Sequence, residues 1–528
     1  MTQDQIKTAP RAWFSMPGVF LLAFVIAMAF ALATDRAWED YLITYRSSKN
    51  FVEGHGLVFN HGERVHTFTS PLGVLLPALC HLLTFRGSDA AALWLFHVFG
   101  ALAFAGAAAL MHRTASSLRF PPAIAGLLVL WLVTDAKSVD FSINGMETGF
   151  LLLFTSHLLW ALLACARRQA LLIGLACGGL MWTRPDGVIY IVALGLGMLL
   201  FAPGEKGRRE WLRTLGIAAV ICTLVYLPWF AWAWSYYGTP VPHTVTAKAN
   251  AVGARTLWGA LQTWLMLPVS MFRGLGSLDG LFMPSGWFYG GWPAWLLPVT
   301  RFIGGLACFV WMLPRQRAEV RVVSFAASIL MAYLGYFPGL NPAPWYLPGP
   351  AWIALLSLAG MKSRLVFPCG IVWLALSTWQ LVEFTRTSAV EQKLVDDGNR
   401  RVVGEWLKAN AKPGDTLFME CLGYLGYYSG LKTYDFPGMS SPEIVQASKK
   451  VGLEWHHLIG ELKPTWLALR PLEAAKLMTA DPALLTQNYR EMRIFDVSAD
   501  VERLDVRGQG LLAFDSIFIV FQRQEAAP

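Results

Sequence analysis

Long apolar runs recur along this chain from its N-terminus to about residue 383, and they constrain its fold more than any other feature. Each run holds about 15 to 25 residues, and a helix of about 20 apolar residues crosses the hydrocarbon core of a bilayer. Hydrophobic residues make up 55% of the chain and charged residues 15%, which is unusual for a soluble domain. We therefore expect a polytopic α-helical membrane protein with eleven transmembrane helices, at 13–34, 90–111, 121–136, 147–165, 169–183, 187–203, 213–234, 291–313, 320–338, 344–361 and 364–383.

Basic residues lie in short clusters between these runs, and they predict the topology. Lys7 and Arg11 precede the first run, which lacks a small-residue cleavage site and is expected to be a retained anchor. Positive clusters favour the cytoplasmic side, and eleven spans place five further clusters there: Arg113 with Arg119, Arg167 with Arg168, Lys206 to Arg213, Arg315 to Arg321, and Lys362 with Arg364. Because this bias explains the net charge of +8, no nucleic-acid partner is expected.

Two segments outside these runs complete the predicted organisation. The apolar stretch 69–84 is short for a span, so an interfacial or re-entrant helix is expected within an outer loop at about 35–89. Residues 385–528 carry more charge, with helix-like stretches at 400–410 and 442–451 and strand-like ones at 415–420, 465–470 and 516–522. The sequence thus predicts a transmembrane domain at 1–384 and a soluble α/β domain at 385–528, which eleven spans place on the outer face.

The outer loop begins with two adjacent carboxylates, Glu39 and Asp40, a few residues after the first run. At a membrane interface, burial raises the basicity of a carboxylate, which suits a general base. The alternative is a solvated pair that favours the N-terminus of a following helix. The residues alone leave open which of the two would be the base.

Four more polar clusters stand at span ends on the same face: "NGMETG" (144–149), "TRPDG" (183–187), "YYGTPVPHTVTAK" (236–248) and "NPAPWYLPG" (341–349). Pro185 disfavours helical geometry at Arg184, so a span is expected to end there. The guanidinium of Arg184 matches a phosphate bidentately, whereas Asp186 can cap the next helix or pair with Arg184. The alternative is an arginine that snorkels to the lipid headgroups.

The loop at 236–248 delivers Tyr236, Tyr237, His243 and Lys248 to this face, either as ligand-binding groups or as a rigid turn with interfacial tyrosines. His243, like His61 and His66, lacks the spacing to a second histidine and a carboxylate that zinc motifs show. No metal site is therefore expected from the residues.

Taken together, "EDYLITYRSSKNFVEGHGLVFNHGERVHTFTSPL" (39–72), "GMET", "TRPDG", "YYGTPVPHTVTAK", "PWY" and "GYLGYYSGLKTYDFPGMSSPEI" (423–444) resemble bacterial membrane glycosyltransferases of the GT-C superfamily. The resemblance extends over about residues 14–440 and is greatest to AftB-like arabinofuranosyltransferases and related enzymes that use polyprenyl-phosphate sugars. The chain departs from the pattern at Glu39, where aspartate is more frequent, and at His243, where asparagine is common.

The resemblance implies an inverting transfer of a sugar, such as arabinofuranose, from a polyprenyl-phosphate donor to a glycan or lipid acceptor. It also implies an outer-face reaction at a bacterial cytoplasmic membrane, with Asp40 or Glu39 as the base. Because cationic side chains can neutralise a leaving monophosphate, no metal is expected to be obligatory, although a divalent ion remains an alternative. The expected donor-phosphate ligands are Arg184, Lys248, His243, Arg64 and Tyr346, and the expected substrate-binding residues are Tyr45, Arg46, Asn50, Thr69, Ser70, Glu147, Asp186, Tyr237 and Trp345.

The C-terminal domain is expected to cover the acceptor side, with Glu420, Tyr424, Tyr427 and Tyr428 as glycan-binding candidates or as packing residues. A secondary transporter and a non-catalytic scaffold are the alternatives to an enzyme. A secondary transporter would carry its polar residues at mid-membrane within repeated halves, and no repeat is evident here. A non-catalytic scaffold would explain the outer domain but gives no reason for arginine, lysine and carboxylate clusters at span ends.

Overall fold

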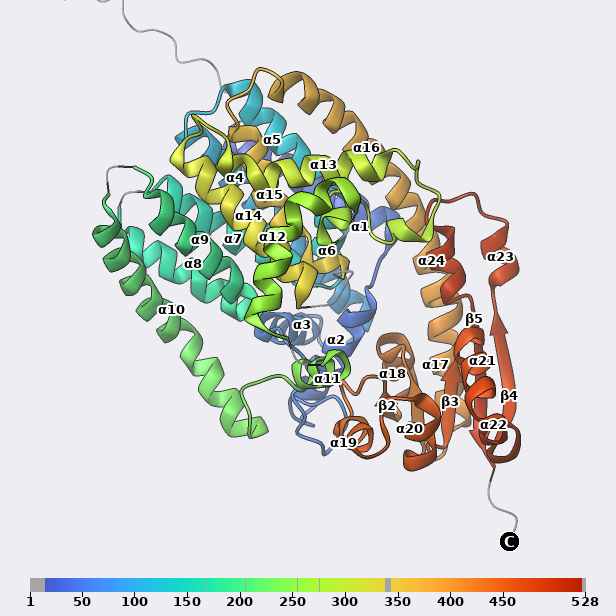
Figure 1. Cartoon of the computed structure of the whole chain (residues 1–528). Helices are drawn as coiled ribbons and strands as arrows, with labels where there is room; N and C mark the ends of the chain where they lie inside the picture. The colour runs from blue at the N-terminus through green and yellow to red at the C-terminus, as the bar shows by residue number, and fades with distance from the viewer. Residues whose placement is uncertain are drawn as a thin grey trace, which may run out of the picture.

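The computed structural model describes residues 15–165, 167–204, 206–253, 255–274, 276–337 and 343–524. Lys7, Arg11, the first two residues of the first predicted run, and Asn341 with Pro342 lie outside these ranges. Apolar helices form a bundle, and the C-terminal region packs beside one end of it, next to the helices that follow the first span (Figure 1).

Each of the eleven predicted runs coincides with a helix. In chain order these are α1 (Met16–Thr34), α4 (Asp89–Ser117), α5 (Pro122–Thr134), α7 (Thr148–Leu163), α8 (Gln169–Thr183), α9 (Gly187–Phe201), α10 (Arg208–Tyr237), α13 (Leu296–Phe309), α14 (Ala318–Tyr336), α15 (Pro348–Gly360) and α16 (Val366–Val390). Within the described ranges, five helices are long and apolar enough to cross a membrane, or six if α5 and the bent helix α6 (Ala136–Ile143) form one span. Several of the others are shorter apolar helices, so the count of eleven spans stays a prediction.

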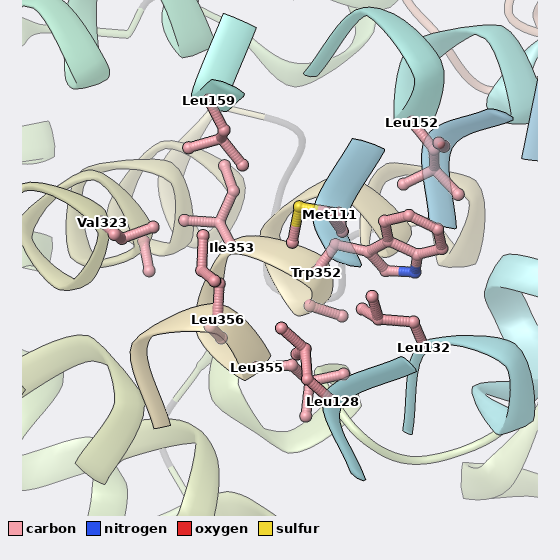
Figure 2. Close-up of a cluster of buried hydrophobic side chains, with 14 of the residues drawn as sticks. Met111, Leu128, Leu132, Leu152, Leu159, Val323, Trp352, Ile353, Leu355 and Leu356 are labelled. Carbon is pink, nitrogen blue, oxygen red and sulfur yellow. The ribbon is translucent and has the colours of Figure 1, made fainter. Parts of the chain in front are cut away.

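The bundle is centred on α15, which is buried along nearly its whole length. Figure 2 shows its Trp352, Ile353 and Leu356 among apolar side chains that come from the neighbouring helices. The indole nitrogen of Trp352 donates a hydrogen bond to Ser138 Oγ over 3.0 Å, so its one polar atom is satisfied. Close packing of this kind gives the loops at the helix ends a rigid base.

Four further helices lie in the loops: α2 (Glu39–Val52), α3 (Pro71–Leu83), α11 (His243–Val252) and α12 (Leu257–Arg273). The helix α3 occupies the stretch for which an interfacial or re-entrant helix was predicted. The helix α12 was not predicted, and it exposes apolar side chains such as Leu257, Trp258 and Phe272. An exposed apolar face on a short helix is typical of a segment that lies against lipid.

The C-terminal region contains a five-stranded sheet in the order β2-β1-β3-β5-β4. Strands β1 (Thr416–Met419), β2 (Lys432–Asp435) and β3 (Trp466–Leu469) run parallel, and β5 (Ile517–Arg523) pairs antiparallel with β3 and with β4 (Tyr489–Asp496). The three predicted strands correspond to β1, β3 and β5, whereas the edge strands β2 and β4 were not predicted. The predicted helical stretches correspond to α17 (Arg401–Asn410) and α19 (Pro442–Val451).

Helices cover both faces of this sheet. Side chains of α17 and α18 (Leu422–Ser429) pack with Leu417 and Trp466 on one face. Side chains of α19, α20 (Trp455–Leu462), α21 (Pro471–Ala480) and α22 (Pro482–Asn488) pack with Phe418 and Leu467 on the other. The π-helical segment η5 (Glu391–Arg400) continues α16 into α17, so one helical stretch joins the bundle to the sheet (Figure 1).

Candidate functional site

A cavity opens beside α2 where several helix ends and loops meet; we call it the α2 cavity. It brings together eight of the residues predicted for the site: Asp40, Thr69, Ser70, Glu147, Arg184, Lys248, Trp345 and Tyr346. These residues come from six separate segments of the chain, spread over about 300 positions. The other lining residues are Ile43, Thr44, Thr67, Phe68, Gly73, Gly145, Met146, Thr244 and Met439.

Asp40 lies in the first turn of α2 and turns its side chain to this cavity. Neither of its carboxylate oxygens has a hydrogen bond or an ion pair with any residue in the described ranges. Burial raises the pKa of Asp40, while the positive charges of Lys248 and Arg184 oppose that shift. Asp40 is therefore a carboxylate of increased basicity that is free to accept a proton.

Glu39, its neighbour in the chain, lies outside the cavity lining and makes a different set of contacts. Its Oε1 accepts a hydrogen bond from the backbone N–H of Gly423 over 3.1 Å, and its Oε2 pairs with Arg400 Nη1 at 3.2 Å. Burial raises the pKa of Glu39 to about 7, against the opposing charge of Arg400. Successive helical residues point about 100° apart, so Asp40 faces the cavity while Glu39 contacts the C-terminal region.

Arg184 follows the last residue of α8, where Pro185 was predicted to end the helix. Its Nη1 lies 3.1 Å from Glu147 Oε1 and its Nε 2.9 Å from Asp186 Oδ1, so Asp186 pairs rather than caps. The guanidinium also stacks 4.3 Å from the centroid of the Tyr346 ring. These contacts fix a nearly buried cation, and they leave its Nη2 without a hydrogen-bond partner among the described residues.

Lys248 supplies a second cation from α11, and its side chain is exposed. No carboxylate in the described part of the chain forms an ion pair with it. The helix α11 is held in place at both ends: His243 N donates to His66 O over 2.7 Å, and Asn250 Nδ2 donates to Ser448 Oγ over 2.9 Å. The position of Lys248 thus depends on the C-terminal region.

His243 does not line the α2 cavity, although it begins the helix that carries Lys248. Burial lowers the pKa of His243, which favours a neutral ring. Its Nε2 and the neighbouring Thr244 Oγ1 are buried without a hydrogen-bond partner in the described ranges. Within those ranges, no three His, Cys, Asp or Glu side chains form a group that could hold a metal ion.

Two predicted substrate ligands, Arg46 and Asn50, instead hold the backbone of neighbouring segments. Arg46 donates to the carbonyl oxygens of Gly426 and Leu431, the latter over 3.1 Å. Asn50 donates to the carbonyl oxygen of Val58 over 2.8 Å. Both side chains are buried, and they join α2 to α18 and to the loop after α2.

Tyr45, Tyr237 and Arg64 also lie outside the lining of the α2 cavity. The Tyr45 hydroxyl hydrogen-bonds to Asp89 over 3.0 Å on the opposite side of α2. The Tyr237 hydroxyl donates to the carbonyl oxygen of Leu57 over 2.6 Å. The Arg64 guanidinium stacks 5.0 Å from the Tyr236 ring centroid, at the C-terminal end of α10.

The cavity includes residues that sequence reasoning did not single out, among them Thr44, Thr244 and Met146. Thr44 lies one helical turn after Asp40 and shares its face of α2, so the helical period alone could have indicated it. Thr244 stands within a loop already singled out, beside His243. Met146 gave no chemical signal.

A second hollow is an apolar groove between α8, α9 and α10. Met181, near the end of α8, and Val188, near the start of α9, both line it and flank Arg184 in the chain. The remaining lining residues are Ile173, Cys177, Ile191, Gly195, Leu215, Ala218, Ala219, Cys222, Thr223, Tyr226, Leu227 and Phe230. The groove therefore ends close to the cation of the α2 cavity.

Sequence comparison matches residues 387–513 to a domain of unknown function, DUF8728. The chain is 29% identical over 299 residues to a terminal β-(1→2)-arabinofuranosyltransferase of Corynebacterium glutamicum, which covers 49% of this chain and 40% of that protein. It is 30% identical over 302 residues to a protein of the same name from Mycobacterium tuberculosis, which covers 51% and 45%. The match thus spans less than half the length of these relatives.

Structure comparison matches most of the chain to two solved enzymes of the GT-C type. The archaeal oligosaccharyltransferase AglB from Archaeoglobus fulgidus, in complex with an inhibitory peptide and a dolichol-phosphate, has a TM-score of 0.55 at 12% identity, over 92% of this chain and 73% of that one. ArnT from Cupriavidus metallidurans, bound to undecaprenyl phosphate, has a TM-score of 0.52 at 12% identity, over 96% and 98%. The chain therefore has the GT-C fold of a membrane protein and, over about half of its length, is homologous to the terminal arabinofuranosyltransferases.

Proposed function

We propose that the chain is an inverting glycosyltransferase that transfers a sugar from a polyprenyl-phosphate donor to a hydroxyl of a glycan or lipid acceptor. One observation carries the proposal: the carboxylate of Asp40, which has no partner among the described residues, shares a cavity with the cations of Arg184 and Lys248. The names of the two arabinofuranosyltransferase relatives support arabinofuranose as the sugar. The lipid phosphates named for the two solved enzymes support the donor class.

In the proposed reaction, the oxygen of the acceptor hydroxyl attacks the anomeric carbon of the donor, and Asp40 accepts the proton of that hydroxyl. The attack comes from the face opposite the phosphate, so the configuration inverts. The bond from the anomeric carbon to the phosphate oxygen breaks, and the lipid phosphate leaves with the bonding electrons. Arg184 and Lys248 neutralise the charge that develops on that phosphate, and for this reason we propose no obligatory metal.

The apolar groove between α8, α9 and α10 is the proposed site for the polyprenyl chain. Its lining is almost wholly apolar, and it ends beside Arg184, where the donor phosphate would bind. A lipid chain that follows the groove would thus present its phosphate to the cavity. The surrounding helices also expose apolar side chains, such as Leu224 of α10, as expected where lipid reaches the protein.

Filling this groove is expected to weaken donor binding. The substitution Ala219→Trp on α10 places a bulky ring in it, so KM for a long-chain donor should rise about tenfold, equivalent to about 1.4 kcal/mol of lost binding. A donor with a very short chain does not need the groove, and its KM should change by less than about twofold. Steady-state kinetics with both donors checks this, and Leu224→Trp, on the exposed side of α10, is the matched control. An equal rise for both donors would argue against the groove.

We further propose two domains: a catalytic domain at 1–384, which includes the outer loop, and an extracytoplasmic domain at 385–528. The match of residues 387–513 to a separate domain model supports this boundary. The ion pair between Glu39 and Arg400 supports the placement of both elements on one side of the membrane. The clustering of basic residues at the opposite helix ends supports a cytoplasmic side there, in a bacterial cell membrane.

The pH dependence of the reaction provides a prediction with a definite sign. Only ionised Asp40 can accept a proton, so kcat/KM should rise with pH as Asp40 ionises. A free aspartate has a pKa of about 3.9. Because burial raises the pKa of Asp40, the rise in kcat/KM should lie at higher pH than this value. The variant Lys248→Met removes a cation that lowers this pKa, so the rise should move to still higher pH. A pH–rate profile that is the same in both proteins would contradict the assignment of Asp40.

The experiment that tests the function is sugar transfer by the purified full chain. It is supplied with a panel of polyprenyl-phosphate sugars that includes arabinofuranose, together with glycan and lipid acceptors. Consumption of one donor with release of the lipid phosphate is the expected result. If no donor reacts, and liposomes that contain the protein move a solute instead, the transporter alternative is favoured.

A further inference from the structure

The C-terminal region contains a cavity of its own, at the carboxyl ends of the parallel strands. Glu420 follows β1, Phe436 and Pro437 follow β2, and Arg470 follows β3, and all four residues line it. The other lining residues are Leu453, Glu454, Trp455, His456, Leu472, Glu473, Lys476, Leu477, Ala480 and Phe514. We call it the Trp455 cavity.

Its position follows from the topology of the sheet. The chain leaves β1 into α18 on one face and leaves β3 into α21 on the other. The loops after these adjacent strands therefore diverge, which opens a crevice at the sheet edge. Open α/β sheets bind their ligands at such points.

The chemistry of the lining favours a hydroxyl-rich ligand over an anionic one, because its three carboxylates outnumber its two cations, Arg470 and Lys476. Arg470 is fully engaged: its Nη2 lies 2.8 Å from Glu420 Oε2, its Nη1 lies 2.6 Å from Glu473 Oε1, and its Nε pairs with Asp515. Because each of its guanidinium nitrogens already has an acceptor, Arg470 has none left for a phosphate. The second oxygen of Glu420 has no partner among the described residues, and the Glu420 side chain is 46% exposed, so it can accept a hydroxyl proton.

Aromatic rings supply the second element of a sugar site. Trp455 and Phe436 lie side by side with ring centroids 5.6 Å apart, and Phe514 stacks on the guanidinium of Arg470. The C–H face of a sugar ring packs on such surfaces while its hydroxyls bond to carboxylates at the rim. A few placed polar groups among apolar rings are typical of a ligand pocket.

The cavity also connects with Glu39, the neighbour in the chain of the proposed base Asp40. Ion pairs run from Glu39 through Arg400 and Asp515 to Arg470, which lines the cavity. The charge of Glu420 is close enough to raise the pKa of both Glu39 and Asp40. These ion pairs thus join the Trp455 cavity to α2, the helix that carries Asp40.

We propose that the Trp455 cavity binds the acceptor glycan, with sugar rings packed on Trp455 and Phe514 and a hydroxyl donating to Glu420. This inference rests on the proposed transferase function. Tyr424, Tyr427 and Tyr428, which were also predicted as glycan ligands, do not line this cavity; they line another one beside Tyr45.

Direct binding to the full chain tests the proposal. The probes are an arabinofuranose oligosaccharide, a mannose oligosaccharide and inorganic phosphate, measured by saturation-transfer NMR and calorimetry. The variant Trp455→Ala should weaken binding of the arabinofuranose oligosaccharide about tenfold, as loss of an aromatic anchor does. The variant Ala480→Trp fills the cavity from an exposed position, so it should block binding without a loss of thermal stability. Glu461→Gln, a charge change on the outer side of α20, should change the Kd by less than about twofold.

The same variants separate this inference from the proposed function. In the transfer assay, Trp455→Ala and Ala480→Trp should raise the acceptor KM about tenfold and leave the donor KM unchanged. If sugar is transferred and neither variant changes the acceptor KM, the Trp455 cavity is not the acceptor site. If an oligosaccharide binds there but no donor is consumed, the transferase proposal fails while the glycan site stands. Phosphate that competes with the oligosaccharide would overturn the proposed ligand class.

Discussion

The variant Asp40→Asn is expected to lose about 10² to 10⁴ in kcat, because an amide cannot accept the proton of the attacking hydroxyl. The substitution keeps the size and shape of the side chain. The Asp40 side chain also makes no hydrogen bond or ion pair in the described part of the chain, so none is broken. Folding and donor KM should therefore stay close to those of the wild type. Single-turnover kinetics with a radiolabelled donor separates the chemical step from donor binding.

Two other carboxylates, one on α2 and one directly after it, are controls for this experiment. Glu53→Gln changes an exposed group at the far end of the helix and should leave kcat unchanged. Glu39→Gln should have a smaller effect than Asp40→Asn, because Glu39 contacts Arg400 and Gly423 rather than the cavity. If Glu39→Gln abolishes turnover and Asp40→Asn does not, the roles of the two carboxylates are reversed.

The second large effect is expected at Arg184. The planar guanidinium pairs with Glu147 and Asp186 and keeps one further nitrogen for the phosphate. Lysine at this position keeps the charge but cannot make these contacts together. We expect Arg184→Lys to lower kcat by about 10² to 10³, the cost of removing one preorganised donor from a developing anion. Transfer rates with donors that carry phosphate or phosphorothioate leaving groups check whether the loss lies at the leaving group.

Because Arg184 is buried among carboxylates, its replacement also affects stability. Lys248→Met avoids this complication, since Lys248 is exposed and unpaired with any described carboxylate. A lower kcat in Lys248→Met, with an unchanged melting temperature, would support the assignment of both cations to the leaving phosphate. Full activity in both variants would rule it out.

The positions of the apolar helices along the chain could largely be predicted from the sequence, because a lipid environment makes apolar length an unusually direct signal. The elements that were not predicted include the helix α12 and the edge strands β2 and β4. The helix α12 carries Gln262 and Pro268 among its apolar residues, and this breaks the uniform run that marks a span. The edge strands β2 and β4 carry charged residues such as Lys432, Arg490 and Arg493, which protect a sheet edge and weaken the strand pattern.

Several residues that line the candidate site could be predicted from the sequence, but the hydrogen bonds of the individual side chains could not. Asp40, Arg184 and Lys248 were expected to act together, and they line one cavity. Arg46 was also predicted to bind the substrate, yet it donates to the carbonyl oxygens of Gly426 and Leu431, which lie about 380 positions further along the chain. No local pattern says whether a polar side chain turns to a ligand or to a remote carbonyl.

The unbroken helical stretch from α16 through η5 to α17 determines how the C-terminal region is rotated relative to the bundle. Each residue of an α-helix such as α16 adds about 100° of rotation and about 1.5 Å of rise. One residue inserted into α16 would turn the guanidinium of Arg400 away from Glu39, and the whole sheet would turn with it. Lengthening by two full turns would restore the angle but move Arg400 by about 10 Å. The number of residues between the bundle and the sheet therefore determines whether Arg400 can pair with Glu39.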